Sequence, residues 1–234
     1  MTRWALVLAV ALLLSAGATI APADEAAFAT ARQTMVERQL RGRDIVDPSV
    51  LRAMSVVPRH AFVRPDTLPA AYADRALPID EGQTISQPYI VALMTQLLAL
   101  GGTEKVLEVG TGSGYQAAVL AEIVPRVYTI EILPGLAASA AARLRELGYA
   151  RVQVRAGDGY RGWPTEAPFD GILVTAGATH IPAPLVEQLA EGGRLVIPVG
   201  PTGIQELIVG RKVEGRLVTR VVAPVRFVPL VEPR

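Results

Sequence analysis

The chain has 234 residues, of which 50% are hydrophobic and 19% are charged, a composition that supports a globular core and excludes a disordered chain. Its 23 Lys and Arg residues nearly balance 22 Asp and Glu residues, so the net charge of +1 gives no electrostatic footprint for nucleic acid. The absence of Cys excludes disulfides, thiolate nucleophiles and Cys-ligated zinc, and two histidines are too few for a His-rich metal site. We therefore expect no metal and no nucleic-acid partner.

The first residues have the pattern of a secretory signal. Arg3 precedes the apolar run Trp4–Leu14, and small residues follow, with suitable cleavage sites after Ala18 and Ala23. We expect residues 1–23 to be a signal peptide and the protein to be exported, to the periplasm. The alternatives are an uncleaved membrane anchor, because the apolar stretch approaches the length of a membrane span, and a cytoplasmic protein. No stable membrane partner is expected if the leader is removed.

Residues 24–104 are predicted to form an N-terminal helical cap that carries a substrate loop. Hydrophobic spacing predicts a helix over Ala26–Leu40, and Asp47-Pro48, a capping residue before a first-turn proline, predicts the start of another. The polar loop Gly82–Pro88 then leads into an apolar helix over Tyr89–Leu100.

From residue 105 onward, short β-branched runs alternate with helical segments, which is typical of a parallel sheet with right-handed crossovers. The predicted strands are Lys105–Val109, Val127–Ile132, Val152–Ala156, Phe169–Thr175 and Arg194–Val199. The predicted helices between them are Tyr115–Ile123, Gly135–Leu147 and Pro184–Ala190. Two more β runs, Glu206–Val213 and Leu217–Val225, flank Glu214-Gly215 and predict a hairpin. We expect an α/β fold: a doubly wound Rossmann-like sheet over residues 105–234, with the N-terminal helical cap and a C-terminal antiparallel hairpin, in one compact domain.

Three glycines at alternate positions, Gly110, Gly112 and Gly114, join the first predicted strand to its helix. Glycine permits a tight turn and lets a ligand approach the backbone closely. The third glycine comes one residue too early for a dinucleotide fingerprint, and the carboxylate of Glu108, two residues before the first glycine, would oppose a pyrophosphate. A ligand with amine and hydroxyl donors suits this carboxylate better. S-adenosylmethionine has both, and we expect it as the cofactor and methyl donor.

Acidic residues also end the next two predicted strands. Glu131 lies 21 residues after Gly110, where an acid accepts hydrogen bonds from ribose hydroxyls; the alternative is a solvated surface glutamate. Asp158 follows the third strand, where it could accept from the adenine amino group; the alternative is a plain turn. The predicted cofactor-binding residues are Glu108, Gly110, Thr111, Gly112, Ser113, Gly114, Glu131, Ile132, Asp158 and Gly159.

The group that accepts the methyl group is indicated by the turn after the fourth predicted strand and by a resemblance to a known family. Val174–Gly177 lacks the Asn/Asp-Pro-Pro-aromatic turn that is typical of enzymes methylating amino groups of bases. The loop Gly82-Gln83-Thr84-Ile85-Ser86-Gln87-Pro88-Tyr89 resembles the signature of protein-L-isoaspartate O-methyltransferases. The similarity covers residues 28–231 and includes Val57–Val63, Ala76–Ile79, Val106–Tyr115, Phe169–Ala176, Gly192–Gly200 and Arg226–Leu230.

This resemblance implies a class I methyltransferase fold and a repair enzyme. It implies transfer of a methyl group from S-adenosylmethionine to the α-carboxylate of L-isoaspartyl residues, followed by succinimide formation. Isoaspartyl-containing proteins and peptides would be the substrates, and a monomer is expected. The sequence departs from the family pattern at two places. Asp80-Glu81, at the rim of the site, is more acidic than the pattern. Val231 stands where some relatives have a hydroxyl, so any cofactor contact through that hydroxyl is lost.

Ser86 is the predicted catalytic residue. A free carboxylate, with a pKa of about 3.5, is already ionised at neutral pH and needs no general base. The Ser86 hydroxyl can donate one hydrogen bond that fixes the acceptor carboxylate, a role that the resemblance also implies; the alternative is that Ser86 caps the following helix. The predicted substrate-binding residues are Thr84, Ile85 and Gln87. His60 is expected to be structural rather than a substrate contact.

Three other functions stay open from the sequence. One is a small-molecule carboxyl or hydroxyl methyltransferase on the same scaffold. Another is a non-catalytic S-adenosylmethionine-binding protein of the cell envelope. The most distant is a nicotinamide oxidoreductase, which binding of NAD instead of S-adenosylmethionine would indicate.

Overall fold

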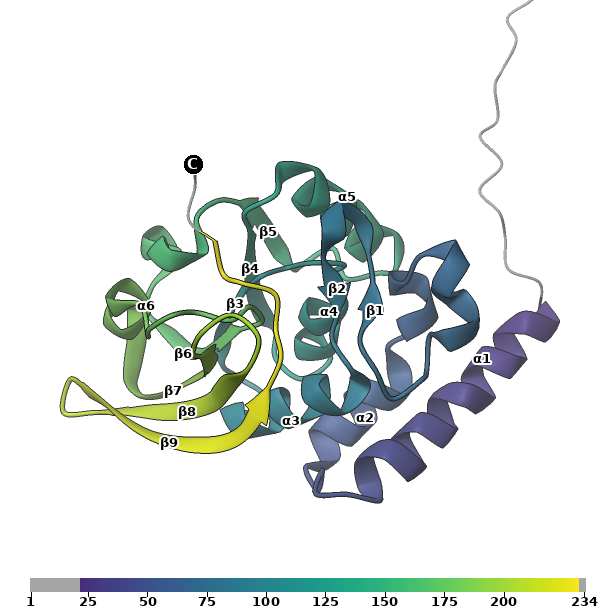
Figure 1. The fold of residues 1–234 in the computed structure, drawn as a ribbon, viewed down its shortest axis with the longest axis horizontal. Helices are drawn as coiled ribbons and strands as arrows, with labels where there is room; N and C mark the ends of the chain where they lie inside the picture. The colour runs from purple at the N-terminus through teal and green to yellow at the C-terminus, as the bar shows by residue number, and fades with distance from the viewer. Residues whose placement is uncertain (1–21, 232–234) are drawn as a thin grey trace, which may run out of the picture.

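The structure is a computed structural model that describes residues 22–231 (Figure 1). The predicted signal peptide, residues 1–23, lies outside the described residues except for its last two, which belong to the first helix. Within the described range, no helix has both the length and the apolar character that crossing a membrane requires.

The N-terminal cap is helical, as predicted. Helix α1 (Pro22–Met35) starts four residues before the predicted helix and continues as a wider π-helical turn, η1 (Val36–Arg41), whose Val36 and Leu40 are buried. Helix α2 (Pro48–Val56) begins where predicted, because the Asp47 carboxylate accepts hydrogen bonds from the backbone N–H groups of Ser49 and Val50. Short 3₁₀ turns follow at η2 (Arg59–Phe62), η3 (Pro65–Ala70) and η4 (Asp80–Gly82).

A small hairpin carries the predicted substrate loop. Strands β1 (Leu77–Pro78) and β2 (Thr84–Ile85) pair antiparallel, and the buried Leu77 lies opposite the buried Ile85. Two residues separate β2 from helix α3 (Pro88–Leu98), which starts one residue earlier than predicted and ends before the left-handed Ala99. The hairpin and α3 therefore hold the short segment between them, which contains Ser86, from both sides.

The main sheet has seven strands in the order β5-β4-β3-β6-β7-β8-β9. Its parallel strands are β3 (Lys105–Val109), β4 (Arg126–Glu131), β5 (Gln153–Ala156), β6 (Phe169–Val174) and β7 (Leu189–Val199). Strands β8 (Gln205–Val213) and β9 (Arg216–Val225) are antiparallel and form the predicted hairpin. The helices between strands are α4 (Tyr115–Ala121), α5 (Pro134–Glu146) and α6 (Ala183–Gln188), with 3₁₀ turns at η5 (Gly159–Arg161) and η6 (Pro164–Glu166). The predicted fold class is confirmed.

Strand β7 is longer than predicted. It begins at Leu189, which pairs with Phe169, whereas the next paired position joins Arg194 to Gly171. The intervening residues form an irregularity that contains Gly192-Gly193, and a bulge of this kind lets pairing continue on both sides of it. Helix α6 ends correspondingly earlier than predicted.

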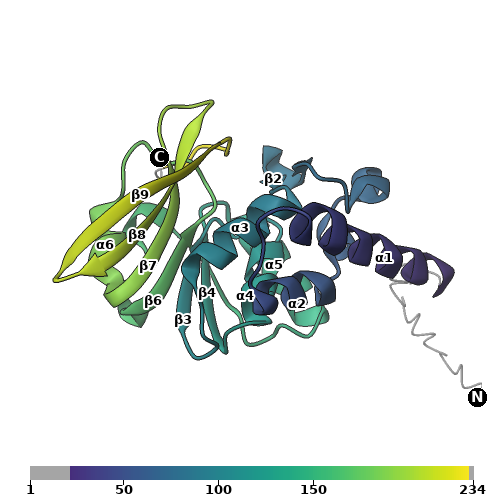
Figure 2. The same ribbon diagram turned by 90° about the horizontal axis from the view of Figure 1, so that it is seen from below.

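The sheet is covered on both faces because side chains alternate along each strand. Val106 packs in the hydrophobic cluster that includes residues of α2, α3 and α4, whereas its neighbour Leu107 packs in the other cluster, with Leu185 of α6. Figures 1 and 2 show α1, α2 and α3 gathered on one side of the molecule, next to the β1–β2 hairpin. The carboxyl ends of the parallel strands meet at one edge, and the candidate site lies there.

Candidate active site

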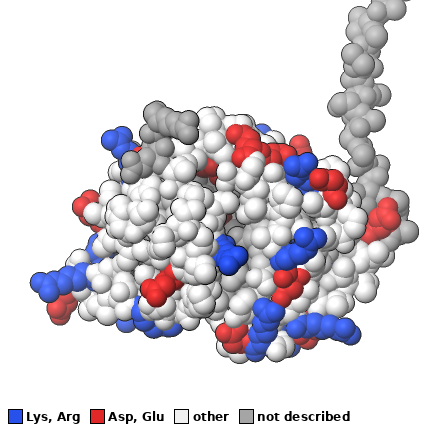
Figure 3. Space-filling model, viewed as in Figure 1, with Lys and Arg blue, Asp and Glu red and all other residues white. Residues whose placement is uncertain are grey.

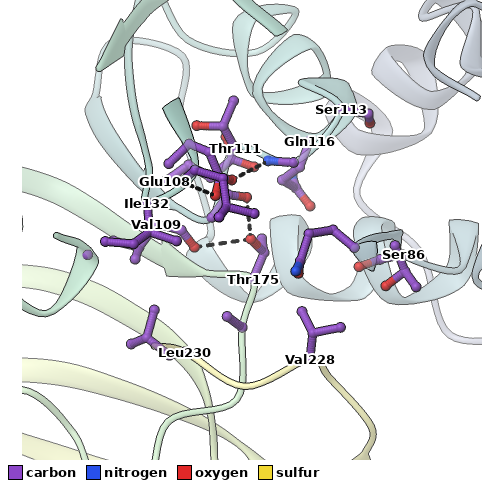
Figure 4. A pocket seen from close by; sticks show the side chains of 18 of the residues that line it. Ser86, Glu108, Val109, Thr111, Ser113, Gln116, Ile132, Thr175, Val228 and Leu230 are labelled. Atoms are coloured by element: carbon purple, nitrogen blue, oxygen red, sulfur yellow. Dashed lines mark hydrogen bonds between the residues drawn. The ribbon is translucent and has the colours of Figure 1, made fainter. Parts of the chain in front are cut away.

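A cavity of about 260 Å³ opens at the carboxyl edge of the parallel strands (Figure 4). Its walls come from the loops after β3, β4 and β6, from the segment between β2 and α3, and from the chain that follows β9. The polar side chains that line it are Gln83, Thr84, Ser86, Glu108, Thr111, Ser113, Gln116, Glu131 and Thr175. Thus segments that are far apart in the sequence, between residues 82 and 231, converge on one partly open space.

The glycine loop after β3 is fixed between two neighbouring strands. The backbone N–H of Gly110 donates to the carbonyl of Ile130, 2.8 Å away, and the Thr175 hydroxyl donates to the carbonyl oxygens of Val109 and Gly110 at 3.0 and 2.6 Å. Gly110 has a φ of +101°, and a Cβ there would lie 2.5 Å from Thr175 Oγ1. A larger residue is excluded at this position by both its backbone conformation and its surroundings.

Glu108 is fully buried and lines the cavity with one carboxyl oxygen unpaired. Its Oε2 accepts a hydrogen bond from Thr129 Oγ1 at 2.6 Å, and Thr129 Oγ1 lies 2.6 Å from Thr111 Oγ1. Its Oε1 has no hydrogen-bond partner among residues 22–231. The pKa of Glu108 is raised to about 8, mainly because the carboxyl group is buried. The Thr129 hydrogen bond opposes this rise, and the nearby charge of Glu131 adds to it. An ammonium group bound here would satisfy an oxygen that is otherwise costly to bury.

Glu131 is 5% exposed, so the alternative of a solvated surface glutamate is wrong. Its Oε2 accepts from the backbone N–H of Gly112 at 2.9 Å, and its Oε1 accepts from that of Leu133 at 3.1 Å. Each carboxylate oxygen can accept a second hydrogen bond, and the side chain lines the cavity. Glu131 can therefore bind a pair of hydroxyl groups without losing the contacts that orient it.

Other predicted cofactor residues are divided between the cavity and its support. Ser113, Ile132 and Gly159 line it, and a Cβ on Gly159 would lie 2.5 Å from Val109 Cγ1. Gly114 is not among the lining residues; it precedes the first turn of α4 with a φ of +91°. Asp158 is also outside the lining set, and its Oδ1 accepts from the backbone N–H of Tyr160 at 2.9 Å. Its predicted contact with adenine stays a prediction.

The predicted substrate loop faces the cavity. Thr84, Ile85 and Ser86 line it, and Figure 4 shows Ser86 across the space from Ile132. The capping position of α3 is occupied by Gln87 without a side-chain hydrogen bond, so the alternative that Ser86 caps this helix is wrong. The Gln87 side chain lies outside the cavity, and its Nε2 donates to Asp74 Oδ1 at 2.8 Å.

A family model described as "Protein-L-isoaspartate(D-aspartate) O-methyltransferase (PCMT)" matches residues 30–234. The chain belongs to this family. It is 58% identical over 220 residues to the protein-L-isoaspartate O-methyltransferase of Opitutus terrae, covering 94% of each chain. It is 54% identical over 230 residues to protein-L-isoaspartate O-methyltransferase 2 of Syntrophobacter fumaroxidans, covering 94% of this chain and 93% of the relative.

A solved structure shows the same family resemblance in three dimensions. It is a putative protein-L-isoaspartate O-methyltransferase from Plasmodium falciparum in complex with S-adenosyl-L-homocysteine. The match has a TM-score of 0.76 at 26% sequence identity and covers 86% of this chain and 99% of that chain. The family assignment therefore agrees with both the sequence and the fold.

Thr129 and the tail residues Val228–Leu230 were not predicted as residues of the site, whereas Val231 was already noted as a departure from the family pattern. Thr129 reaches Glu108 because β3 and β4 pair with these two residues opposite each other. The tail Val228–Val231 lines the cavity, held by hydrogen bonds of 2.8 Å from Gly177 N to Val228 O and from Leu230 N to Gly177 O. The resemblance to the isoaspartate methyltransferase family in Arg226–Leu230 was the available signal for the tail.

His60 is structural, as expected. Its ring stacks on Phe28 with a centroid separation of 4.2 Å, its Nδ1 lies 2.8 Å from Tyr72 Oη, and its Nε2 lies 3.2 Å from Glu25 Oε2. It is not among the residues that line the cavity.

Of the two departures from the family pattern, Val231 lines the cavity, and Glu81 adopts a left-handed conformation with φ 53°.

Proposed function

We propose that this chain transfers a methyl group from S-adenosylmethionine to the α-carboxylate of L-isoaspartyl residues in proteins. The methyl ester then closes to a succinimide through the neighbouring backbone nitrogen, and hydrolysis returns part of the product as normal aspartate. Family membership supports this activity. The observation that carries it in the structure is that Ser86 and Glu108 line one cavity, so the acceptor and the methyl donor can meet there.

The donor side of the cavity is formed by the loops after β3 and β4. S-adenosylmethionine supplies an electrophilic methyl group on its sulfonium. The free Oε1 of Glu108 would hold the ammonium group, and Glu131 would hold the ribose hydroxyls. The left-handed Gly110 and Gly112 leave the backbone accessible, and Ile132 contributes apolar surface.

The acceptor side needs alignment rather than proton transfer. The substrate carboxylate is ionised at neutral pH, and the lining residues include no His, Cys or Lys that could act as a base. Ser86 donates a hydrogen bond that fixes the angle of the carboxylate without neutralising it. The apolar side chains of Ile85, Val91 and Val228 exclude water from the reacting groups.

A matched pair of peptides tests this function. One synthetic peptide contains an L-isoaspartyl residue, and its twin has the same sequence with normal aspartate. With labelled S-adenosylmethionine, we expect a methyl ester on the isoaspartyl peptide alone. Equal labelling of both peptides would contradict the proposed specificity. Binding of S-adenosylhomocysteine without labelling of either would favour the non-catalytic alternative.

We also propose that the protein is exported to the periplasm, on the pattern of residues 1–23. Expression of the full chain in a Gram-negative host, followed by fractionation and N-terminal sequencing, tests this. We expect periplasmic protein that starts after Ala18 or Ala23. Uncleaved protein in the cytoplasm or the membrane would contradict the proposal.

A further inference from the structure

A second hollow, of about 460 Å³, lies beside the active-site cavity and shares part of its wall. Thr84 and Ser86 line both spaces. Its other walls come from the segment before β1, the start of α3, the turn between β7 and β8, and the end of β9. We call this hollow the flanking groove. It therefore adjoins Ser86, the residue that we propose to bind the carboxylate of the substrate.

The flanking groove is lined by two exposed arginines that come from different segments of the chain. Arg75 precedes β1, and Arg226 follows β9. Among residues 22–231, neither guanidinium has an ion pair or a side-chain hydrogen bond. The carboxylate that lines the groove, Asp74, already accepts from Arg43 and from Gln87 Nε2. The two arginines can therefore pair with an acidic group of a ligand. Figure 3 shows basic side chains, with acidic ones near them, in the middle of the face that Figure 1 presents.

The groove also has an apolar surface. Ile204, in the turn between β7 and β8, is 56% exposed there, and Ile90 and Phe227 lie in the same lining. A groove lined by an exposed aliphatic side chain and two cationic groups suits an extended peptide that offers both aliphatic and acidic groups. A small anion alone would leave this apolar surface in water.

We propose that the flanking groove binds the peptide residues next to the isoaspartyl residue and favours an acidic side chain among them. The inference rests on the proposed function, because it needs the isoaspartyl carboxylate at Ser86. Because Thr84 and Ser86 line both spaces, the polypeptide on one side of that carboxylate can extend past these two residues into the groove. Arg75 and Arg226 are specificity-determining residues in this arrangement and touch no reacting atom.

Isoaspartyl peptides that differ at a single flanking residue test the inference. Glu, Gln and Lys versions are prepared for the position before and for the position after the isoaspartyl residue. For one of these positions, we expect kcat/KM to fall in the order Glu, Gln, Lys, mainly through KM. Each step should be about two- to five-fold, the range of exposed ion pairs, and should shrink at high salt.

Charge reversal gives the sharper comparison. The double variant Arg75→Glu/Arg226→Glu should invert the order of the three peptides while S-adenosylhomocysteine binding stays unchanged. The control Arg216→Glu/Arg220→Glu changes the net charge equally, at exposed positions of β9 outside both hollows, and should keep the wild-type order. If the reversed variant does not fold, Arg75→Gln/Arg226→Gln should make the three peptides nearly equal.

The failures of the two proposals are distinguishable. A wild-type enzyme that methylates all three peptides with equal kcat/KM at both positions overturns the inference and leaves the proposed function intact. The same holds if the Arg216/Arg220 control inverts the order as strongly as the groove variant does. A wild-type protein that methylates none of the isoaspartyl peptides refutes the proposed function and the inference with it.

Discussion

The buried Glu108 carboxyl links cofactor binding to pH. Burial raises its pKa to about 8, so at pH 7 the group is mostly protonated in the free protein, whereas an ammonium ligand favours the ionised form. We predict that binding of S-adenosylhomocysteine at pH 7 releases protons from Glu108. Calorimetry in two buffers with different ionisation enthalpies measures this release. Glu108→Gln should abolish this proton release and weaken the binding of S-adenosylhomocysteine about 10- to 100-fold, as expected for the loss of a hydrogen bond to a charged group.

The raised pKa of Glu108 also makes the free energy of unfolding of the ligand-free protein depend on pH. Because the folded-state pKa lies above the ordinary value of 4.5, the contribution of Glu108 to stability is complete below that value and is lost as the pH rises through about 8. The wild-type protein should therefore lose more stability than Glu108→Gln between pH 6 and pH 9 in urea unfolding. An identical loss in both proteins would show that Glu108 is ionised in the folded state.

The Ser86 hydroxyl is predicted to act on the acceptor alone. Ser86→Ala should lower kcat/KM for an isoaspartyl peptide about 10- to 100-fold, because a hydrogen bond to a carboxylate is lost, and should leave S-adenosylhomocysteine affinity unchanged. Ser139→Ala, on α5 and away from both hollows, serves as the control and should behave as wild type. Unchanged peptide kinetics in Ser86→Ala would remove this residue from the mechanism.

At the residue scale, the sequence predicted which acidic residue lies at the glycine loop, but not which residue donates a hydrogen bond to it. The glycine spacing and the early carboxylate placed Glu108 at the cofactor loop. Thr129 could not be predicted as its hydrogen-bond donor, because that contact depends on the register between β3 and β4, which no local pattern encodes.

At the scale of elements, strand β3 and the cap of α2 were predicted correctly, because a short β-branched run and a capping residue before proline are local signals. The π-helical turn η1 and the irregularity in β7 were missed. Both depend on packing against distant segments, as in the pairing of Leu189 with Phe169 across the bulge.

His60 makes the stability of the cap sensitive to acid. Burial lowers its pKa below 6.5, outweighing the opposing effect of Glu25, so the buried ring is held neutral. The contribution to stability is present above about pH 6.5 and is lost as the pH falls, because the unfolded state binds the proton more readily. We predict that His60→Gln has a smaller loss of unfolding free energy between pH 7 and pH 5 than wild type.

The other histidine provides the control for this measurement. His180 is exposed, so His180→Gln should keep the wild-type pH dependence of urea unfolding. If His60→Gln and wild type lose the same stability between pH 7 and pH 5, the buried His60 does not couple the cap to pH.

At the scale of the whole molecule, the site unites parts of the chain that are far apart in sequence. The parallel strands predicted where the glycine loop and Glu131 would meet, because their carboxyl ends share one edge. The closure of the cavity by Val228–Leu230 rests on long-range hydrogen bonds to Gly177, which explains why sequence reasoning did not include the tail in the site. Export would also separate the enzyme from the cytoplasm, where S-adenosylmethionine is made.

The central claim is that the cavity beside Glu108 and Glu131 holds an adenosyl thioether and not a dinucleotide. Isothermal titration of the purified protein with S-adenosylhomocysteine and, separately, with NAD tests it most directly. We predict one equivalent of S-adenosylhomocysteine per chain, much weaker binding in Glu131→Ala, and no binding of NAD. Saturable binding of NAD, with no heat from S-adenosylhomocysteine, would contradict the account.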